Sequence, residues 1–204
     1  GHPFSDLYTS NEEKVFQKYS LDSQNQFVSI LPGSRKSEIR DLLPTYIDFI
    51  KIHSKKNENY KYLIPASDQE ILELIVSYIP PSLPIRVETE SAKDFLSISK
   101  FSIVTSGTAT LESAILGVFP IICYKTNPIN YFIISRMLKV DNIGLPNLLL
   151  GVRKFPELIQ RNCNPISINA ASKEIEDMQS VSAQLRELLI GETEEEYINA
   201  ILKL

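Results

Sequence analysis

The sequence predicts an α/β fold in which helices flank a mostly parallel sheet, and three observations lead to this prediction. Short apolar runs alternate with longer segments of helical periodicity. Each helical segment separates two apolar runs, as in successive βαβ units. The composition, with 43% hydrophobic and 23% charged residues, is that of a globular protein. A length of 204 residues suits one domain with a trailing helical segment.

The expected elements follow in order along the chain. Strands are predicted at residues 27–31, 61–64, 85–87, 101–104 and 121–124. Helices are predicted at residues 38–53, 68–79, 92–99 and 109–116. This rhythm is typical of a single Rossmann-like domain, which we place at residues 1–168. Residues 169–204 are charged and helical in character, and we expect this C-terminal segment to pack on the same domain.

Composition excludes several classes of function. A formal net charge of -4 argues against a nucleic-acid partner, because affinity for phosphate backbones depends on clustered Lys and Arg. The sequence holds two histidines, which excludes a multi-histidine metal site and makes a Ser-His-Asp triad a poor candidate. Cys123 and Cys163 form no metal-binding pattern, and both fit a reducing, cytoplasmic setting. Cys123, within "PIICYK", is expected to be a buried thiol. We therefore expect neither a metal nor a cofactor.

Parallel sheets bind ligands beyond the carboxyl ends of their strands, so the loops after Leu31 and Val104 are the candidate sites. The first loop, "LPGSR", places Gly33 where the backbone needs conformational freedom and Ser34 where a hydroxyl could cap the next helix. A capped turn explains both residues. It does not explain Arg35, a cation at a helix N-terminus, which the helix dipole disfavours unless an anion lies there.

The second loop, "TSGTATLE", repeats this arrangement. Ser106, Gly107 and Thr108 form a turn between a strand and a helix, where free backbone N–H groups can bind phosphate. Glu112 follows one turn into the helix, placed to accept hydrogen bonds from a ribose diol. The alternative is an ordinary helix start, in which Thr108 caps the helix and Glu112 complements its dipole.

A third segment, "GLPNLLLG" at residues 144–151, centres on Asn147. This amide either ties down a loop from a buried position or faces a ligand, and the segment alone does not separate the two.

Taken together and in this order, these segments resemble the lipid-A-disaccharide synthase family, glycosyltransferases of the two-domain GT-B type. The resemblance rests on "GHP" at residues 1–3, "LPGSR", "SGTATLE", a tyrosine and a lysine before Pro128, "LPNLL" and "PELIQ". It implies the C-terminal half of a GT-B fold. It also implies transfer of 2,3-diacylglucosamine from its UDP derivative to 2,3-diacylglucosamine 1-phosphate, with inversion, without a bound metal, and with UDP released.

The resemblance also implies roles for individual residues. Arg35 would offset charge on the leaving diphosphate, with Gly33 and Ser34 beside it. Ser106, Gly107 and Thr108 would bind phosphate, and Glu112 would bind ribose. Asn147 would face the nucleotide side of the cleft.

A GT-B enzyme has two such domains, so we expect the acceptor-binding domain and the general base to lie outside this chain. The acylated substrates imply a peripheral position at the inner face of the cytoplasmic membrane, and residues 131–140 have a composition compatible with an interfacial helix. Core packing explains the same segment. Two alternatives remain for function: another UDP-sugar enzyme such as an epimerase or a different GT-B glycosyltransferase, or a solitary nucleotide-binding module without catalysis.

Overall fold

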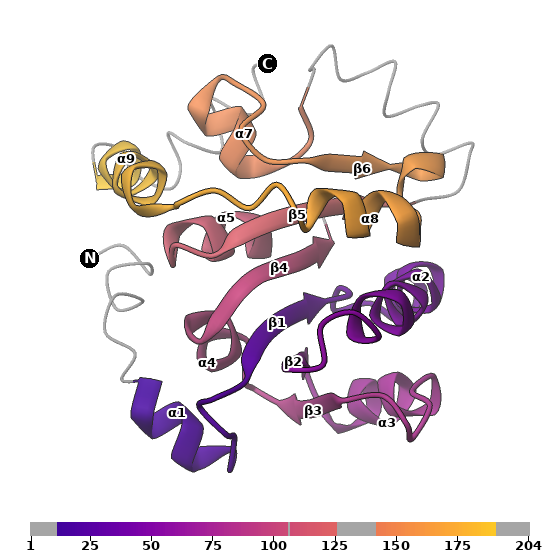
Figure 1. Ribbon diagram of the computed structural model, residues 1–204. Helices are drawn as coiled ribbons and strands as arrows, with labels where there is room; N and C mark the ends of the chain where they lie inside the picture. Colours follow the sequence, from indigo (N-terminus) through magenta and orange to yellow (C-terminus); the bar gives the residue numbers. More distant parts are fainter. Residues whose placement is uncertain (1–11, 106, 126–141, 191–204) are drawn as a thin grey trace.

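The computed structural model of the chain describes residues 12–105, 107–125 and 142–190. Its centre is one six-stranded, fully parallel sheet (Figure 1) with the strand order β3-β2-β1-β4-β5-β6. The strands are β1 (Gln26–Leu31), β2 (Tyr60–Ala66), β3 (Ile85–Thr89), β4 (Ser99–Thr105), β5 (Phe119–Tyr124) and β6 (Glu157–Ile159). This order is that of the Rossmann fold, so the predicted fold class is confirmed.

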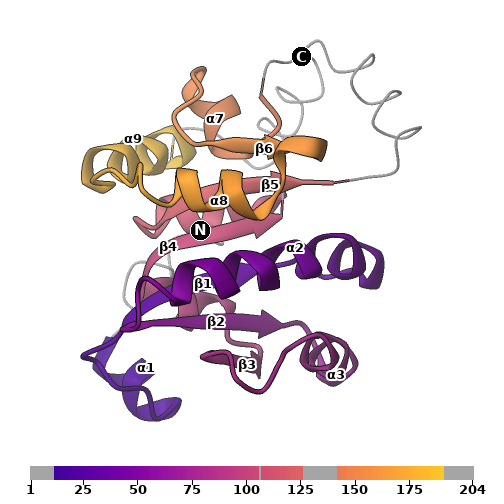
Figure 2. The same cartoon turned by 45° about the vertical axis from the view of Figure 1, so that its right-hand side comes forward.

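Helices cover both faces of the sheet. One face carries α2 (Lys36–Ser54), α3 (Gln69–Ser77) and α8 (Pro165–Ala171), and α2 contacts the other two. The other face carries α4 (Ala92–Ser97), α5 (Thr108–Ile115), α7 (Leu145–Leu150) and α9 (Gln179–Ile190), with α1 (Glu12–Lys18) against α4. The two views in Figures 1 and 2 agree on this layering. A 3₁₀ turn, η2 (Gln160–Asn162), follows β6.

The chain changes face between β3 and β4, and this change positions the site. The helices α2 and α3 follow β1 and β2 on one face, whereas α4 and α5 flank β4 on the other. Adjacent strands β1 and β4 therefore lead into helices on opposite faces. At such a switch point the loops diverge and leave a crevice beyond the carboxyl ends of the strands.

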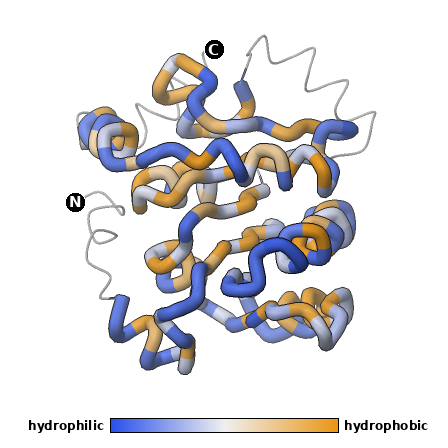
Figure 3. The backbone as a smooth tube through the Cα atoms, in the orientation of Figure 1, coloured by the Kyte–Doolittle hydropathy of each residue, from blue (hydrophilic) through white to orange (hydrophobic). Residues whose placement is uncertain are grey.

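Apolar residues of the strands and inward helix faces form the core. Figure 3 shows hydrophobic stretches along the central strands and along one side of α2. On α2, the buried residues Ile39, Leu42, Leu43, Tyr46 and Ile50 recur at helical spacing. Strand β1 is buried from its second residue to its last, as a central strand of a parallel sheet must be.

The predicted elements are confirmed to within a few residues, and one strand was not predicted. Strand β6 has three residues, too few to form a recognisable apolar run, and it ends at Ile159, just before Gln160, whose φ is +51°. Helix α9 contacts α5 and α7, and α8 spans the predicted division at residue 168. Cys123 is buried, as the sequence predicted, and so is Cys163.

Candidate functional site

A cavity of about 640 Å³ lies beyond the carboxyl ends of β1, β2, β3 and β4. It is lined by residues 31–35 and Glu38 after β1, residues 65–67 after β2, residues 90–93 after β3, and Thr105, residues 107–109 and Glu112 after β4. The cavity is thus at the switch point of the sheet, and its size is in the range of small-molecule sites. Six of the eight predicted site residues line it: Gly33, Ser34, Arg35, Gly107, Thr108 and Glu112.

At the start of α2, the carboxylate of Glu38 provides a negative charge from within the chain. The Glu38 carboxylate accepts a hydrogen bond from the Arg35 backbone N–H (3.4 Å) and pairs with the Arg35 guanidinium at 3.1 Å. Gly33 has a φ of +102°, and a Cβ there would overlap the Glu38 side chain. Glycine is therefore required at this position by its backbone and by its neighbour.

This arrangement corrects two expectations. The residue at the N-cap position of α2 is Arg35, and the predicted cap by Ser34 is wrong. The conflict between Arg35 and the helix dipole, which suggested a bound anion, is relieved within the chain by Glu38. Arg35 remains 80% exposed at the cavity rim, so its guanidinium has the freedom to contact a ligand.

The start of α5 differs from that of α2. Its N-cap residue is Gly107, which has a φ of +145° and no side chain to accept from the first amides of the helix. The predicted cap by Thr108 is wrong, because Thr108 is the first helical residue. A Cβ on Gly107 would meet nothing within 4 Å, so open space faces this backbone. The first turn of α5 holds no acidic residue, which leaves the positive end of the helix dipole available to an anion.

Glu112 lies one turn further along α5 and is half-buried in the cavity wall. Burial raises the pKa of its carboxyl group, and the positive charge of Lys93 partly opposes this shift. Ser106, the remaining predicted phosphate ligand, lies outside the described residues.

Lys93 of α4 lines the cavity, while the next residue, Asp94, anchors α4 to the N-terminal part of the chain. The Asp94 carboxylate accepts hydrogen bonds from Nζ of Lys18 in α1 (2.7 Å) and from Oη of Tyr19, the residue after α1 (2.8 Å). Ser91 Oγ donates to the Glu88 carbonyl at 3.0 Å, which closes the turn between β3 and α4. Sequence reasoning missed Lys93 and this loop. The rule applied to the loops after β1 and β4 would have found it, because β3 ends at the same edge of the sheet.

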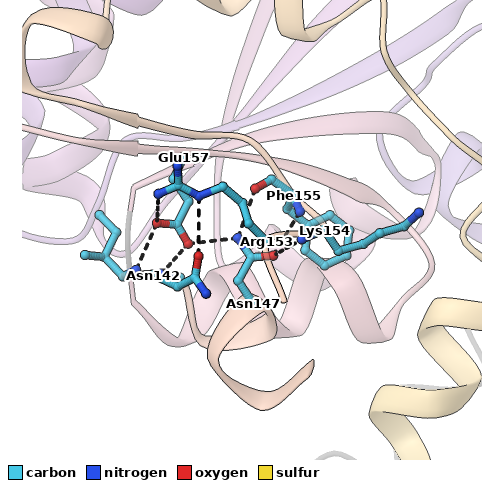
Figure 4. Close-up of polar contacts among 8 residues, drawn as sticks. Asn142, Asn147, Arg153, Lys154, Phe155 and Glu157 are labelled. Atoms are coloured by element: carbon cyan, nitrogen blue, oxygen red, sulfur yellow. Dashed lines mark hydrogen bonds and ion pairs between the residues drawn. The ribbon is translucent and has the colours of Figure 1, made fainter. Parts of the chain in front are cut away.

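Asn147 is not in the cavity. Its side chain is fully buried, and Nδ2 donates to the Phe155 carbonyl (2.9 Å) and to Glu157 Oε1 (2.8 Å). Oδ1 accepts from the N–H groups of Lys154 and Phe155, both at 2.9 Å. Figure 4 shows these contacts converging between α7 and β6. Because all four hydrogen bonds of the amide are used within the protein, the predicted nucleotide-facing role is corrected to a structural one.

Glu157 is the centre of the same cluster, which sequence reasoning did not single out. Its carboxylate also accepts from the N–H groups of Ile143 (2.9 Å) and Gly144 (3.0 Å). The Arg153 guanidinium lies 3.6 Å from it. This cluster joins α7 to β6, and α7 in turn contacts α5, so Asn147 supports the cavity from a distance.

Within the described part of the chain, no three His, Cys, Asp or Glu side chains are grouped as a metal site would need. No helix in that part has the length and apolar character needed to cross a bilayer. Residues 131–140, considered above as an interfacial helix, are outside the described ranges.

Comparison with known proteins identifies the family. The family model described as lipid-A-disaccharide synthetase matches residues 1–200. The chain belongs to this family. The lipid-A-disaccharide synthase of Sulfurihydrogenibium sp. (strain YO3AOP1) is 35% identical over 205 residues, covering 93% of this chain and 53% of the relative. That of Persephonella marina is 34% identical over 177 residues, covering 82% and 46%. The chain therefore spans about half the length of the curated lipid-A-disaccharide synthases it matches.

Solved structures share the fold of this family member. The ADP-heptose heptosyltransferase II of E. coli superposes with a TM-score of 0.57 at 12% identity, over 86% of this chain and 53% of that one. The C-terminal CMP-Kdo binding domain of WaaA from Acinetobacter baumannii superposes with a TM-score of 0.52 at 12% identity, over 87% and 95%. The Rossmann-like fold is thus that of glycosyltransferase domains, and membership of the lipid-A-disaccharide synthases disfavours the epimerase alternative.

Proposed function

We propose that this chain is the donor-binding domain of a lipid-A-disaccharide synthase and that its cavity binds UDP-2,3-diacylglucosamine. One observation carries the proposal. At the switch point of the sheet, the uncapped start of α5 at Gly107 and the half-buried carboxylate of Glu112 face one cavity, one helical turn apart. A nucleoside diphosphate has the two groups that complement these features: its diphosphate matches the helix start, and its ribose diol matches the carboxylate.

The sequence suggested phosphate binding at the starts of both α2 and α5, whereas we assign it to α5. At α2, Glu38 already supplies a negative charge, so we place the diphosphate at α5, with Ser106, Gly107 and Thr108 around it. The Arg35 guanidinium turns from Glu38 toward the diphosphate from the opposite rim. Glu112 accepts hydrogen bonds from the ribose hydroxyls, since an ionised carboxylate offers acceptors to both.

In the reaction we propose, the 6-hydroxyl of 2,3-diacylglucosamine 1-phosphate attacks the anomeric carbon with inversion, and UDP leaves. Negative charge builds on the diphosphate as the bond breaks. Fixed donors at the start of α5 stabilise that charge without reorganising, and the Arg35 guanidinium adds a positive charge beside it. The acceptor site and the general base belong, in this proposal, to a further N-terminal domain of the longer relatives. Because the proposed substrates carry acyl chains, we propose that the enzyme works at the cytoplasmic face of the inner membrane.

Titration calorimetry of the chain with UDP, ADP and CMP tests the proposal. We expect UDP to bind tightest and Glu112→Gln to weaken UDP at least about tenfold, by removing a charge-assisted acceptor. Glu58→Gln, an exposed carboxylate in the turn before β2, is the matched control and should bind like the wild type. Addition of EDTA should leave the affinity unchanged, since protein groups offset the charge. A folded chain that ignores UDP, or that prefers ADP, would contradict the proposal.

A further inference from the structure

The cavity holds a cation that the proposed donor site does not yet use. Among its described lining residues the cations are Arg35 and Lys93, and the carboxylates are Glu38, Glu90 and Glu112. Arg35 and Glu38 form an ion pair with each other. Glu90 is exposed, where water screens its charge. The charges that act on each other inside the cavity are therefore those of Lys93 and Glu112.

In the proposed complex, ligand binding shifts the protonation equilibrium of Glu112 toward the neutral carboxyl group. The side chain is half-buried before anything binds, and a nucleotide would displace the water that remains around it. A diphosphate would also bring negative charge into the same cavity. Both effects favour a protonated carboxyl group. A protonated Glu112 accepts fewer hydrogen bonds from a ribose diol than a carboxylate does.

Lys93 opposes both effects, and the fold holds it in place to do so. The residues around Lys93 are fixed: Ser91 and Phe95 are fully buried, and Asp94 accepts hydrogen bonds from Lys18 of α1 and from Tyr19 just after it. Resting on the proposed function, we infer that Lys93 is a positioning residue for the donor site: its ammonium group keeps Glu112 ionised, and so able to accept from ribose, while a nucleoside diphosphate fills the cavity.

Other charged groups near α5 do not replace Lys93. Arg186 of α9 donates to the Ile115 carbonyl at the opposite end of α5, at 2.7 and 3.1 Å. Arg35 stands across the cavity on α2, paired with Glu38, and in the proposed complex its charge is directed at the diphosphate. Glu38 and Glu90 carry negative charge, so neither can supply the positive charge that favours an ionised Glu112.

The test is calorimetry of UDP binding at about pH 6, closer to the range in which a carboxyl group titrates, repeated in buffers of different ionisation enthalpy so that protons taken up on binding are counted. We expect Lys93→Met to bind UDP about tenfold more weakly than the wild type and to take up more protons, because Glu112 becomes protonated as the complex forms. Lys93→Arg should restore both properties. Lys100→Met, an exposed lysine at the amino end of β4, is the matched control and should behave as the wild type.

Repeating the Lys93→Met change in the Glu112→Gln variant distinguishes an effect of Lys93 on Glu112 from direct contact between Lys93 and the ligand. In Glu112→Gln, which has no proton to gain, the further change Lys93→Met should alter neither the affinity nor the proton count. If the loss persists there undiminished, Lys93 acts on the diphosphate itself and the inference is wrong. If Lys93→Met matches Lys100→Met while the wild type binds UDP, the inference fails and the proposed function stands. If the folded wild type does not bind UDP, both fail. Thermal melts of each variant establish that it is folded.

Discussion

Asn147 shows how one buried side chain can organise a turn without touching a ligand. Its amide uses two donors and two acceptor positions on the segment between α7 and β6. Glu157, its carboxylate partner, has a side chain with 0% exposure. Buried polar groups are tolerated only when they are paired, so each member of this cluster depends on the others.

We predict that Asn147→Ala lowers the free energy of unfolding by about 3 kcal/mol, because it leaves the Glu157 carboxylate and two backbone N–H groups short of partners in the interior. Urea denaturation measures this loss. Asn162→Ala, an exposed asparagine in η2, is the control and should change stability little. UDP affinity, measured at a temperature where Asn147→Ala is folded, should stay within about twofold of the wild type. A large loss of UDP affinity in the folded variant would indicate that Asn147 contacts the ligand.

At this scale the sequence could not decide between the two roles of Asn147. The partner that settles the matter, Glu157, lies ten residues away, and no local pattern marks it. Arg35 was misjudged for a similar reason. Its conflict with the helix dipole was real, but the anion that relieves it is Glu38, three residues along the same helix. Gly33, Gly107 and Glu112 were correctly predicted to lie at the cavity, because each stands in the short segment that follows a predicted strand and this can be recognised from the neighbouring sequence.

The helix starts are the elements that give the cavity its chemistry. Helix α2 begins with an ion pair, whereas α5 begins with a bare glycine in a backbone conformation that L side chains rarely adopt. Glycine adopts this conformation without strain and lets a ligand approach the backbone closely. The contrast between the two starts is the reason to place the diphosphate at α5.

Gly107→Ala tests this assignment. We predict a loss of about 1–3 kcal/mol in the free energy of unfolding, because a side chain at a φ of +145° is strained even where space is open. UDP affinity should fall by about tenfold or more, as the first amides of α5 shift, while uridine, which lacks the diphosphate, should lose less. Gly151→Ala, at a φ of +67° after α7, is the control for strain alone. Equal losses for UDP and uridine would place the diphosphate elsewhere.

Elements were predicted where a strong local signal marks them. The first five strands carry runs of β-branched and aromatic residues, and the four helices between them have apolar stripes. The three residues of β6 are too short to produce such a signal, and its place at the edge of the sheet depends on pairing with β5. The turn before α4, Glu90 and Ser91, and the helix start with Lys93 were not predicted as part of the site, because this stretch contains no glycine.

For the whole molecule, the half-buried carboxyl group of Glu112 in the proposed donor site makes the folding stability depend on pH. Burial raises the pKa of Glu112, so the folded chain binds that proton more tightly than the unfolded chain does. Stability from this group is therefore fully present at pH values below the unfolded pKa and is lost as the pH rises through the folded pKa.

We predict that Glu112→Gln raises the melting temperature by roughly 1–2 °C at pH 8, because the neutral amide removes a half-buried charge. Below about pH 4, where the glutamate is already protonated in both states, the gain should vanish. Differential scanning calorimetry across this pH range measures the effect, with Glu58→Gln as the exposed control. A variant less stable than the wild type at pH 8 would mean that Glu112 contributes to folding as well as to binding.

The sheet order has a consequence for how such a domain can change over time. The charged residues of the cavity stand in loops or in the first two turns of helices, and none stands within a strand. Substitutions there leave the interior packing untouched, so selection for a new nucleotide and selection for a stable interior act on separate sets of positions. Chains named for ADP-heptose and for CMP-Kdo keep this sheet at 12% identity. An architecture divided in this way can diversify its ligands without rebuilding its core.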